Sequence, residues 1–147
     1  MPPLDRFAAY AAAFERFVAS RDGAVLEPFF TEGAVYETIG GPPFEGVAEG
    51  RDAVIAALAG SLDGFDRRFA TRELATLDGP RADGDRVWFR WRATYSKPGL
   101  PDLAIEGEET ATFEGERIAR LEDRFTDASV KEATAYLGAH AAALFGD

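Results

Sequence analysis

Apolar side chains recur at intervals of three and four residues in three stretches of the chain, which predicts three amphipathic helices. The shared face of the first helix consists of Phe7, Tyr10, Phe14, Phe17 and Val18. Asp5 is expected to cap its N-terminus, and Gly23 is expected to follow its last turn. The second helix is predicted over residues 51–63 and the third over residues 129–145, where Ser129 opens a capping-box pattern.

A period of two residues, which is typical of β-strands, replaces the helical period between these stretches. Strands are predicted over residues 34–39, 67–78, 86–96, 103–113 and 117–125. Within 67–78, Arg72 and Glu73 interrupt the alternation. Turn-forming residues separate the later strands, which predicts an antiparallel meander. The segment Gly40-Gly41-Pro42-Pro43 is expected to end the first strand as an irregular loop.

The alternation also assigns the two faces of the sheet. Along residues 86–96, the inner face receives Val87, Phe89, Trp91, Ala93 and Tyr95. The outer face carries arginines on 86–96 and 117–125 and glutamates on 103–113, a pattern typical of cross-strand ion pairs. It also carries Trp88, which a solvated sheet does not require. We therefore expect the outer face to form a homodimer interface.

Helices combined with a bent antiparallel sheet define an α+β domain. No linker, internal repeat or low-complexity segment divides the sequence, so residues 1–147 are expected to form a single domain. A chain of this length buries roughly two-thirds of its surface on folding. The 46% of hydrophobic residues are therefore sufficient for a core without covalent cross-links.

Composition and charge exclude several functions. The 16 basic and 26 acidic residues give a net charge of −10, which argues against nucleic acids and membranes as partners. The chain has no cysteine and therefore no thiolate chemistry, and its single histidine, His140, excludes a histidine-cluster metal site. The N-terminus does not fit a signal peptide and no apolar run reaches membrane-spanning length. A cytoplasmic protein without a cofactor or metal is expected.

Two carboxyl groups fall on the apolar face of the sheet. Glu109 shares its face with Ile105 and Phe113, and Asp123 lies between Leu121 and Phe125. A three-residue loop within 114–118 would place Glu109 opposite Asp123, whereas a two-residue loop would break that register. Two carboxyl groups so close do not both ionise readily, so one neutral acid beside one carboxylate is expected.

Other interpretations of these acids remain open. An ion pair with an inward arginine, or a hydrogen bond from Tyr or Trp, would explain either acid without catalysis. A bulge at Gly107 would exchange Glu108 for Glu109 on the inner face. If the register predicted above holds, Asp123 and Glu109 are the candidate catalytic residues, because an acid beside a base suits proton transfer.

The expected ligand-binding residues are aromatic or apolar side chains on the same inner face. They are Tyr36, Trp91, Tyr95, Tyr10, Phe113 and Leu121. Tyrosine and tryptophan combine an apolar body with a hydrogen-bonding tip, which suits a ring-shaped ligand. The direction of Tyr36 is left open, because Val35, Glu37 and Ile39 can equally form the inner face of their strand.

Three segments resemble the nuclear transport factor 2-like superfamily, in particular its SnoaL-like polyketide cyclases and ketosteroid isomerases. They are Phe-Phe-Thr-Glu-Gly-Ala-Val-Tyr-Glu at 29–37, Phe44-Glu45-Gly46 with the helix start at 49–54, and the closing hairpin at 113–125. The resemblance covers nearly the whole chain. It implies a cone-shaped, strongly bent sheet wrapped around helices, the cystatin-like α+β roll, with one deep pocket.

The resemblance also bears on the candidate acids. Glu109 matches a strand acid that helps to bind the oxyanion in the isomerases, and Asp123 is the nearest match to the base of the cyclases. The chain departs from the isomerases at two positions, because Thr38 stands near their general base and Phe17 near their oxyanion tyrosine. Steroid isomerisation by that residue set is therefore not expected, and fold analogy alone does not choose a reaction.

Two functions follow as hypotheses. In the first, the protein binds a small apolar, oxygenated ligand in the pocket and performs acid–base chemistry of an isomerase, cyclase or hydrolase type with its carboxyl groups. In the second, the same fold is a non-catalytic ligand-binding or accessory dimerisation domain. Glu109 and Asp123 distinguish the two, because ion-paired acids with no adjoining cavity would contradict catalysis.

Overall fold

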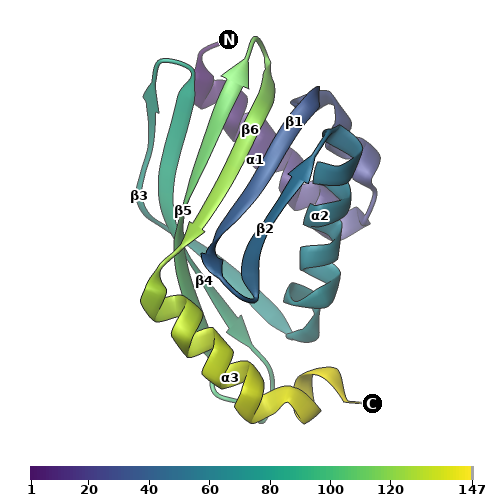
Figure 1. Ribbon diagram of the computed structural model, residues 1–147, viewed down its shortest axis with the longest axis vertical. Coiled ribbons are helices and arrows are strands. Elements are labelled where there is room, and N and C mark those ends of the chain that lie inside the picture. Colours follow the sequence, from purple (N-terminus) through teal and green to yellow (C-terminus); the bar gives the residue numbers. More distant parts are fainter. Residues whose placement is uncertain (147) are drawn as a thin grey trace.

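A computed structural model describes residues 1–146 of the chain (Figure 1). Three α-helices are present: α1 over Pro3–Ser20, α2 over Arg51–Gly64 and α3 over Asp127–Phe145. Short 3₁₀ turns lie at Gly23–Val25, Glu27–Phe29 and Asp66–Arg68. Within residues 1–146, none of these helices is both long and apolar enough to cross a membrane.

Six strands form one curved sheet. They are β1 (Phe30–Gly41), β2 (Phe44–Glu49), β3 (Thr71–Asp83), β4 (Arg86–Ser96), β5 (Leu103–Glu114) and β6 (Arg117–Phe125), in the order β2-β1-β6-β5-β4-β3. All neighbours are antiparallel except β1 and β6, which are parallel, so the sheet is mixed. The predicted α+β class with a bent sheet is confirmed, and the single parallel pair is the departure from it.

The helices fill the concave side of the sheet (Figure 1). Helix α1 packs its buried face of Phe7, Tyr10, Ala13 and Phe17 into one core with α2, β1 and β6. Helix α3 closes the opposite end of the sheet and forms a second core with the far ends of β4 and β5. The apolar faces predicted from the sequence are therefore buried, as the hydrophobic effect requires.

Strand β2 is the element that the sequence pattern missed. Its residues are mostly exposed, and Val47 keeps 62% of its surface in solvent. An edge strand with this exposure shows no apolar alternation, which explains the missed prediction. Gly40 and Gly41 belong to β1 rather than to an irregular loop, and only the Pro42-Pro43 turn joins the two strands.

Several element ends differ from the prediction. Helix α1 begins at Pro3 rather than after Asp5, and its last turn is followed by Arg21 in the left-handed conformation rather than by Gly23. Helix α3 is capped by the Thr126 hydroxyl, because that oxygen accepts a hydrogen bond from the Ser129 amide. The hydroxyl of Ser129 instead accepts the amide of Glu106 and ties α3 to β5. Strand β3 continues to Asp83, five residues beyond the predicted end at 78.

Candidate functional site

A cavity of about 370 Å³ lies between the helices and the concave face of the sheet. Its walls are mostly apolar and come from α1, α2 and every strand of the sheet; the aromatic side chains are Phe7, Tyr10, Phe14, Tyr36, Phe44, Phe65, Phe89, Trp91, Tyr95 and Phe125. Four acids, Glu15, Asp66, Glu109 and Asp123, also line it. Mostly apolar walls with a few polar groups are typical of small-molecule sites.

Glu109 and Asp123 lie directly opposite each other on β5 and β6. The expected pairing is present, but the predicted reason for it is wrong. The hairpin turns through Gly115-Glu116 alone, and the unpaired residue Ala119 then restores the register as a β-bulge. The bulge also reverses the faces near the turn, so that Ile118 rather than Ala119 is buried with Leu121.

The two carboxyl groups lie half-buried on the cavity wall. Burial is the main cause that raises the pKa of Glu109 well above its ordinary value, and the neighbouring charge of Asp123 raises it further. Burial also raises the pKa of Asp123, while hydrogen bonds from Glu109 and Tyr36 hold it down. These effects favour the proton on Glu109 and the charge on Asp123. The predicted pair of a neutral acid and a carboxylate therefore has a physical basis.

Tyr36 points into the cavity, which settles the direction that the alternation left open. Its hydroxyl donates a hydrogen bond of 2.7 Å to Oδ2 of Asp123. Burial raises the pKa of Tyr36 well above its ordinary value, so the hydroxyl remains a donor. Tyr10 of α1 lies on the cavity wall near the same acids, and burial raises the pKa of its hydroxyl as well. Asp123 thus accepts a hydrogen bond from a neutral tyrosine, and a second neutral tyrosine lies nearby.

The structure excludes two of the alternative interpretations of the inner acids and retains the third. Within residues 1–146, neither Glu109 nor Asp123 forms an ion pair. The β4–β5 register runs without a bulge, so Glu108 remains outside and Glu109 inside. Gly107 fits this register because a Cβ atom there would lie 2.7 Å from the Trp91 ring. A tyrosine hydrogen bond is present, but the pair adjoins a cavity.

A second polar centre lies in the same cavity and was not predicted. Nε of Arg72 lies 3.0 Å from Oδ2 of Asp66, and both side chains are largely buried. Burial raises the pKa of Asp66 to about 6, and Arg72 and a hydrogen bond from Tyr95 oppose that shift. Arg72 alternates inward with Leu74 and Thr76 along β3, so its charge concealed a regular strand face in the sequence. Asp66 lies in a 3₁₀ turn that gives no periodic signal.

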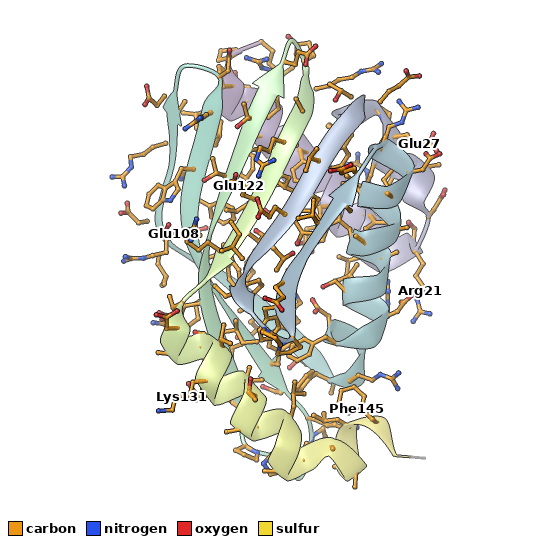
Figure 2. All side chains as sticks on the ribbon, in the orientation of Figure 1. Arg21, Glu27, Glu108, Glu122, Lys131 and Phe145 are labelled. Carbon is orange, nitrogen blue, oxygen red and sulfur yellow. The ribbon has the colours of Figure 1, made fainter. Side chains whose placement is uncertain are left out.

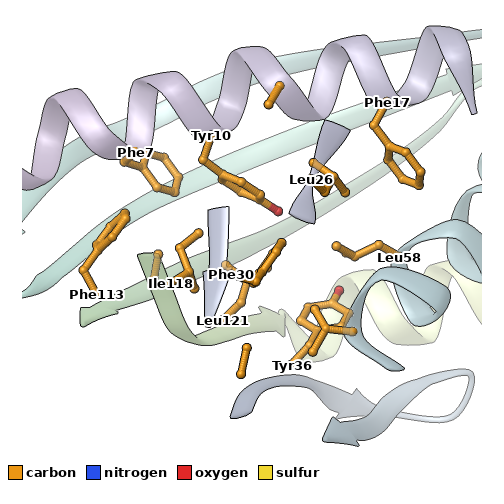
Figure 3. Close-up of a cluster of buried hydrophobic side chains, with 14 of the residues drawn as sticks. Phe7, Tyr10, Phe17, Leu26, Phe30, Tyr36, Leu58, Phe113, Ile118 and Leu121 are labelled. Atoms are coloured by element: carbon orange, nitrogen blue, oxygen red, sulfur yellow. The ribbon is translucent and has the colours of Figure 1, made fainter. Parts of the chain in front are cut away.

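The predicted ligand-binding residues divide into two groups. Tyr36, Trp91, Tyr95 and Tyr10 line the cavity. Phe113 and Leu121, which were predicted to contact a ligand, lie outside the lining of this cavity. Both are buried in the core beneath α1 with Ile118 and Phe30, as Figure 3 shows.

The structure also shows where the two residues that differ from the isomerases lie. Thr38 lies opposite Asp123 in the β1–β6 register, and Phe17 is fully buried in the α1 core. His140 packs against the Tyr136 ring on α3 and does not line the cavity. Residues 1–146 contain no group of three or more histidine or acidic side chains arranged to hold a metal ion.

The outer face of the sheet carries the charges that the alternation assigned to it. Arg92 of β4 forms an ion pair with Glu106 of β5, and Arg120 bridges Glu122 and Glu37. Figure 2 shows Glu108 and Glu122 over the side of the sheet opposite α1. Trp88 lies on this face beneath the Arg81 guanidinium, at 4.5 Å from the ring centre.

Comparison with known proteins identifies the fold. A family model described as a SnoaL-like domain matches residues 8–121. A search of curated proteins finds no match. Solved structures are similar over most of the chain. The structure of Bal32a, from a soil-derived mobile gene cassette, is 24% identical, covers 87% of this chain and 97% of its own, and has a TM-score of 0.62.

Two further structures show the same fold. An NTF2-like protein of unknown function from Burkholderia pseudomallei is 18% identical, covers 88% of this chain and 95% of its own, and has a TM-score of 0.66. A putative SnoaL-like polyketide cyclase from Jannaschia sp. CCS1 is 17% identical over 84% of this chain and 90% of its own, with a TM-score of 0.59. The chain belongs to the SnoaL-like domain family of the nuclear transport factor 2-like superfamily.

Proposed function

We propose that the protein binds a small, apolar, oxygenated ring compound in its cavity and moves a proton on it, as isomerases and cyclases do. The observation that carries this proposal is the Glu109–Asp123 pair, which faces the cavity and, within residues 1–146, forms no ion pair. Such an arrangement costs folding free energy, because like charges and burial both oppose ionisation. Perturbed carboxyl groups in an apolar cavity are typical of acid–base sites.

The roles follow from where the proton resides. Asp123, held ionised by the Tyr36 hydroxyl, removes a proton from a carbon next to a carbonyl group. The carbon–hydrogen bond breaks, its electron pair moves into an enolate, and Asp123 becomes neutral. Tyr10 and neutral Glu109 donate hydrogen bonds toward the developing negative oxygen, and a proton then returns to a carbon of the enolate.

Solvent deuterium exchange tests this step without knowledge of the natural ligand. The protein is incubated in D₂O with a panel of bicyclic to tetracyclic ketones that have an enolisable position, and deuterium incorporation is followed by NMR. The proposal expects wild-type protein to accelerate exchange for those ketones that bind. Asp123→Asn removes the base, and Glu109→Gln keeps a donor but removes the acid.

A matched control is available next to the pair. Glu108→Gln changes the same side chain one residue away, on the outer face, and is expected to retain wild-type exchange. Exchange at the uncatalysed rate for every ketone that binds would contradict the catalytic proposal. Equal rates for wild type and Asp123→Asn would contradict the role of Asp123.

The second candidate is a non-catalytic ligand-binding domain. The mostly apolar wall of the cavity favours it, since this wall binds a ligand without any proton transfer. Ligand binding with wild-type affinity in Asp123→Asn, together with no exchange in either protein, is the result that supports it.

SnoaL-like proteins commonly form dimers, and we propose that this chain does so through the outer face of the sheet. This face carries paired charges on β4, β5 and β6 and includes Trp88. Light scattering tests the proposal. A dimer mass that Trp88→Ala reduces to a monomer mass supports it, and a monomeric wild-type protein at micromolar concentration contradicts it.

A further inference from the structure

The second polar centre of the cavity, formed by Arg72, Asp66 and Tyr95, is not used by the proton transfer described above. Arg72 projects from β3 and stands opposite Tyr95 of β4 in the sheet register. Among the residues of 1–146 that line the cavity, Arg72 is the one basic side chain. It lies close enough to Glu109 to oppose the rise in the pKa of that acid, so it belongs to the same chamber.

The guanidinium has hydrogen-bonding capacity that the protein does not use. Its Nε lies 3.0 Å from Asp66, yet this buried atom makes no well-aligned hydrogen bond, and one terminal nitrogen lies 3.8 Å from Glu15. A guanidinium carries five N–H donors in a planar fork that fits a carboxylate with two parallel hydrogen bonds. A largely buried guanidinium with unused donors is therefore suited to a ligand oxygen group.

The charges of the cavity fix where an anionic group can lie. The charge of Asp123 at one centre repels a carboxylate, whereas Arg72 at the other attracts it. Tyr95 adds no charge to this centre, because burial raises the pKa of its hydroxyl well above the ordinary value and the hydroxyl donates to Asp66. Trp91 and Phe89 supply apolar wall on the same strand, β4, as Tyr95. A ligand with one acidic end and an apolar body therefore has a single favourable orientation.

We propose that the Arg72–Asp66–Tyr95 centre is a binding subsite for a ligand carboxylate, and that it positions the ligand's apolar ring at the Glu109–Asp123 pair. Only the positioning of the ring at the Glu109–Asp123 pair rests on the proposed function. The substrate class is then a hydrophobic ring ketone that also carries a carboxylate group, rather than a ring ketone without an acidic group. The binding of the acid group itself does not depend on any proton transfer.

Proton uptake is a further expected property of this subsite. Asp66 faces Arg72 of β3 and Tyr95 of β4, lies near Arg67 in its own turn, and Glu15 of α1 faces the far side of Arg72. A bound carboxylate adds a negative charge beside Asp66 and raises its pKa above the value of about 6 in the free protein. Asp66 then takes up a proton as the ligand binds, so affinity for the acid rises as pH falls from 8 to 6.

Matched pairs of ligands test the subsite. Isothermal titration calorimetry compares a series of ring carboxylates, from 2-naphthylacetate to larger fused-ring acetates, with the methyl ester of each. The expected result is at least about tenfold tighter binding of the acid than of the ester by wild-type protein, which is the range for a charge-assisted pair. Titrations in buffers of different ionisation enthalpy measure the proton uptake at pH 7.

Variants separate this subsite from the catalytic pair. Arg72→Gln is expected to remove the preference for the acid while ester binding is retained, and Asp66→Asn is expected to strengthen acid binding at pH 8 and abolish its pH dependence. Asp66→Asn also serves where Arg72→Gln fails to fold. Glu108→Gln is the control with unchanged affinities. Glu109→Gln, which affects proton transfer, is expected to retain the preference for acids.

Three results would overturn the inference. They are equal affinity of wild type for acid and ester, binding of esters alone, and binding of none of the acids. An unchanged acid preference in a folded Arg72→Gln protein would overturn it as well. Failure of deuterium exchange with a retained acid preference would contradict the catalytic proposal and leave the subsite supported.

Discussion

The two polar centres of the cavity treat their carboxyl groups differently. At the Arg72–Asp66–Tyr95 centre, Asp66 has the Arg72 guanidinium 3.0 Å away, and its pKa rises only to about 6. At the carboxyl pair, Glu109 faces Asp123, and burial and the like charge both raise the pKa of Glu109. Both centres lie in one chamber and burial raises the pKa at each, but the neighbouring groups act in opposite directions: Arg72 lowers the pKa of Asp66, and Asp123 raises that of Glu109.

The Glu109–Asp123 pair favours proton transfer, whereas the Arg72–Asp66–Tyr95 centre favours ligand binding. The Arg72 guanidinium lowers the free-energy cost of burying Asp66, and it can also bind an anionic group of a ligand. An uncompensated pair keeps a proton and a charge side by side, which destabilises the fold but suits proton transfer. Protein sites that depart from stable arrangements are often functional. The following predictions test this division of roles.

The largest expected effect is on proton transfer at the uncompensated pair. Asp123→Asn removes the carboxylate base and is expected to lower the rate of deuterium exchange by roughly 10²–10³-fold, the usual range for loss of a general base. NMR in D₂O measures the rate. Glu122→Gln alters the neighbouring acid on the outer face and is the control. A loss of less than threefold in Asp123→Asn would place the base elsewhere.

Removal of the cation at the compensated centre is expected to affect stability most. Arg72→Gln leaves Asp66 buried without its partner, which is expected to cost about 2 kcal/mol of unfolding free energy at pH 7–8. The loss is expected to be small near pH 4, where Asp66 is protonated in both proteins, and to grow as pH rises, because the unpaired carboxyl resists ionisation.

Urea unfolding at pH 4 and pH 8 measures this difference. The double variant Arg72→Gln with Asp66→Asn is the matched comparison, because it removes the charge as well as its partner, and most of the lost stability is expected to return. Equal losses in the single and double variants would show that Arg72 acts through packing alone.

Loss of the tyrosine donor is expected to have an intermediate effect. Tyr36→Phe removes the 2.7 Å hydrogen bond that holds the pKa of Asp123 down, so that pKa rises. Because the base acts in its ionised form, the acidic limb of the pH–rate profile for exchange moves to higher pH. A roughly tenfold lower rate is expected on that limb, since a hydrogen bond to a charge contributes about 1.5 kcal/mol. A uniform loss at all pH values would indicate a role in ligand binding instead.

The smallest expected effect is a gain in stability at the uncompensated pair. Glu109→Gln removes an acid whose pKa is higher in the folded than in the unfolded protein. Such an acid makes the wild type less stable as pH rises from about 4.5 toward the folded pKa. The variant is therefore expected to be about 1 kcal/mol more stable at pH 8 and indistinguishable at pH 4. Calorimetric melting at both values measures it, and a less stable variant at pH 8 would contradict it.

Much of the fold was predictable because its elements bury one regular face. The β4 alternation placed Trp91 and Tyr95 on the cavity wall, and Glu109 and Asp123 stood out as charges on apolar faces. Strand β2 was not predictable, because a solvent-exposed edge strand needs no apolar face. The bulge at Ala119 was not predictable either, because a two-residue turn with a bulge produces the same later register as a three-residue loop.

The second centre shows the limit of the same reasoning. In the sequence, Arg72 only interrupts the alternation of β3, and Asp66 belongs to a short 3₁₀ turn that has no periodic pattern. An acid and a base from separate elements form a site only when the chain folds them together, and no local period records that meeting. The signal available was that Arg72 keeps the inward register of Leu74 and Thr76.

The protonation of the uncompensated pair is the point on which the proposed chemistry depends. NMR titration of side-chain carboxyl carbons between pH 4 and pH 9, with assignments from Glu109→Gln and Asp123→Asn, measures it in the folded protein. We expect the Glu109 carboxyl carbon to retain the chemical shift of a protonated acid at pH 7, while Asp123 has that of a carboxylate. Ionisation of both groups with midpoints below pH 5 would contradict it.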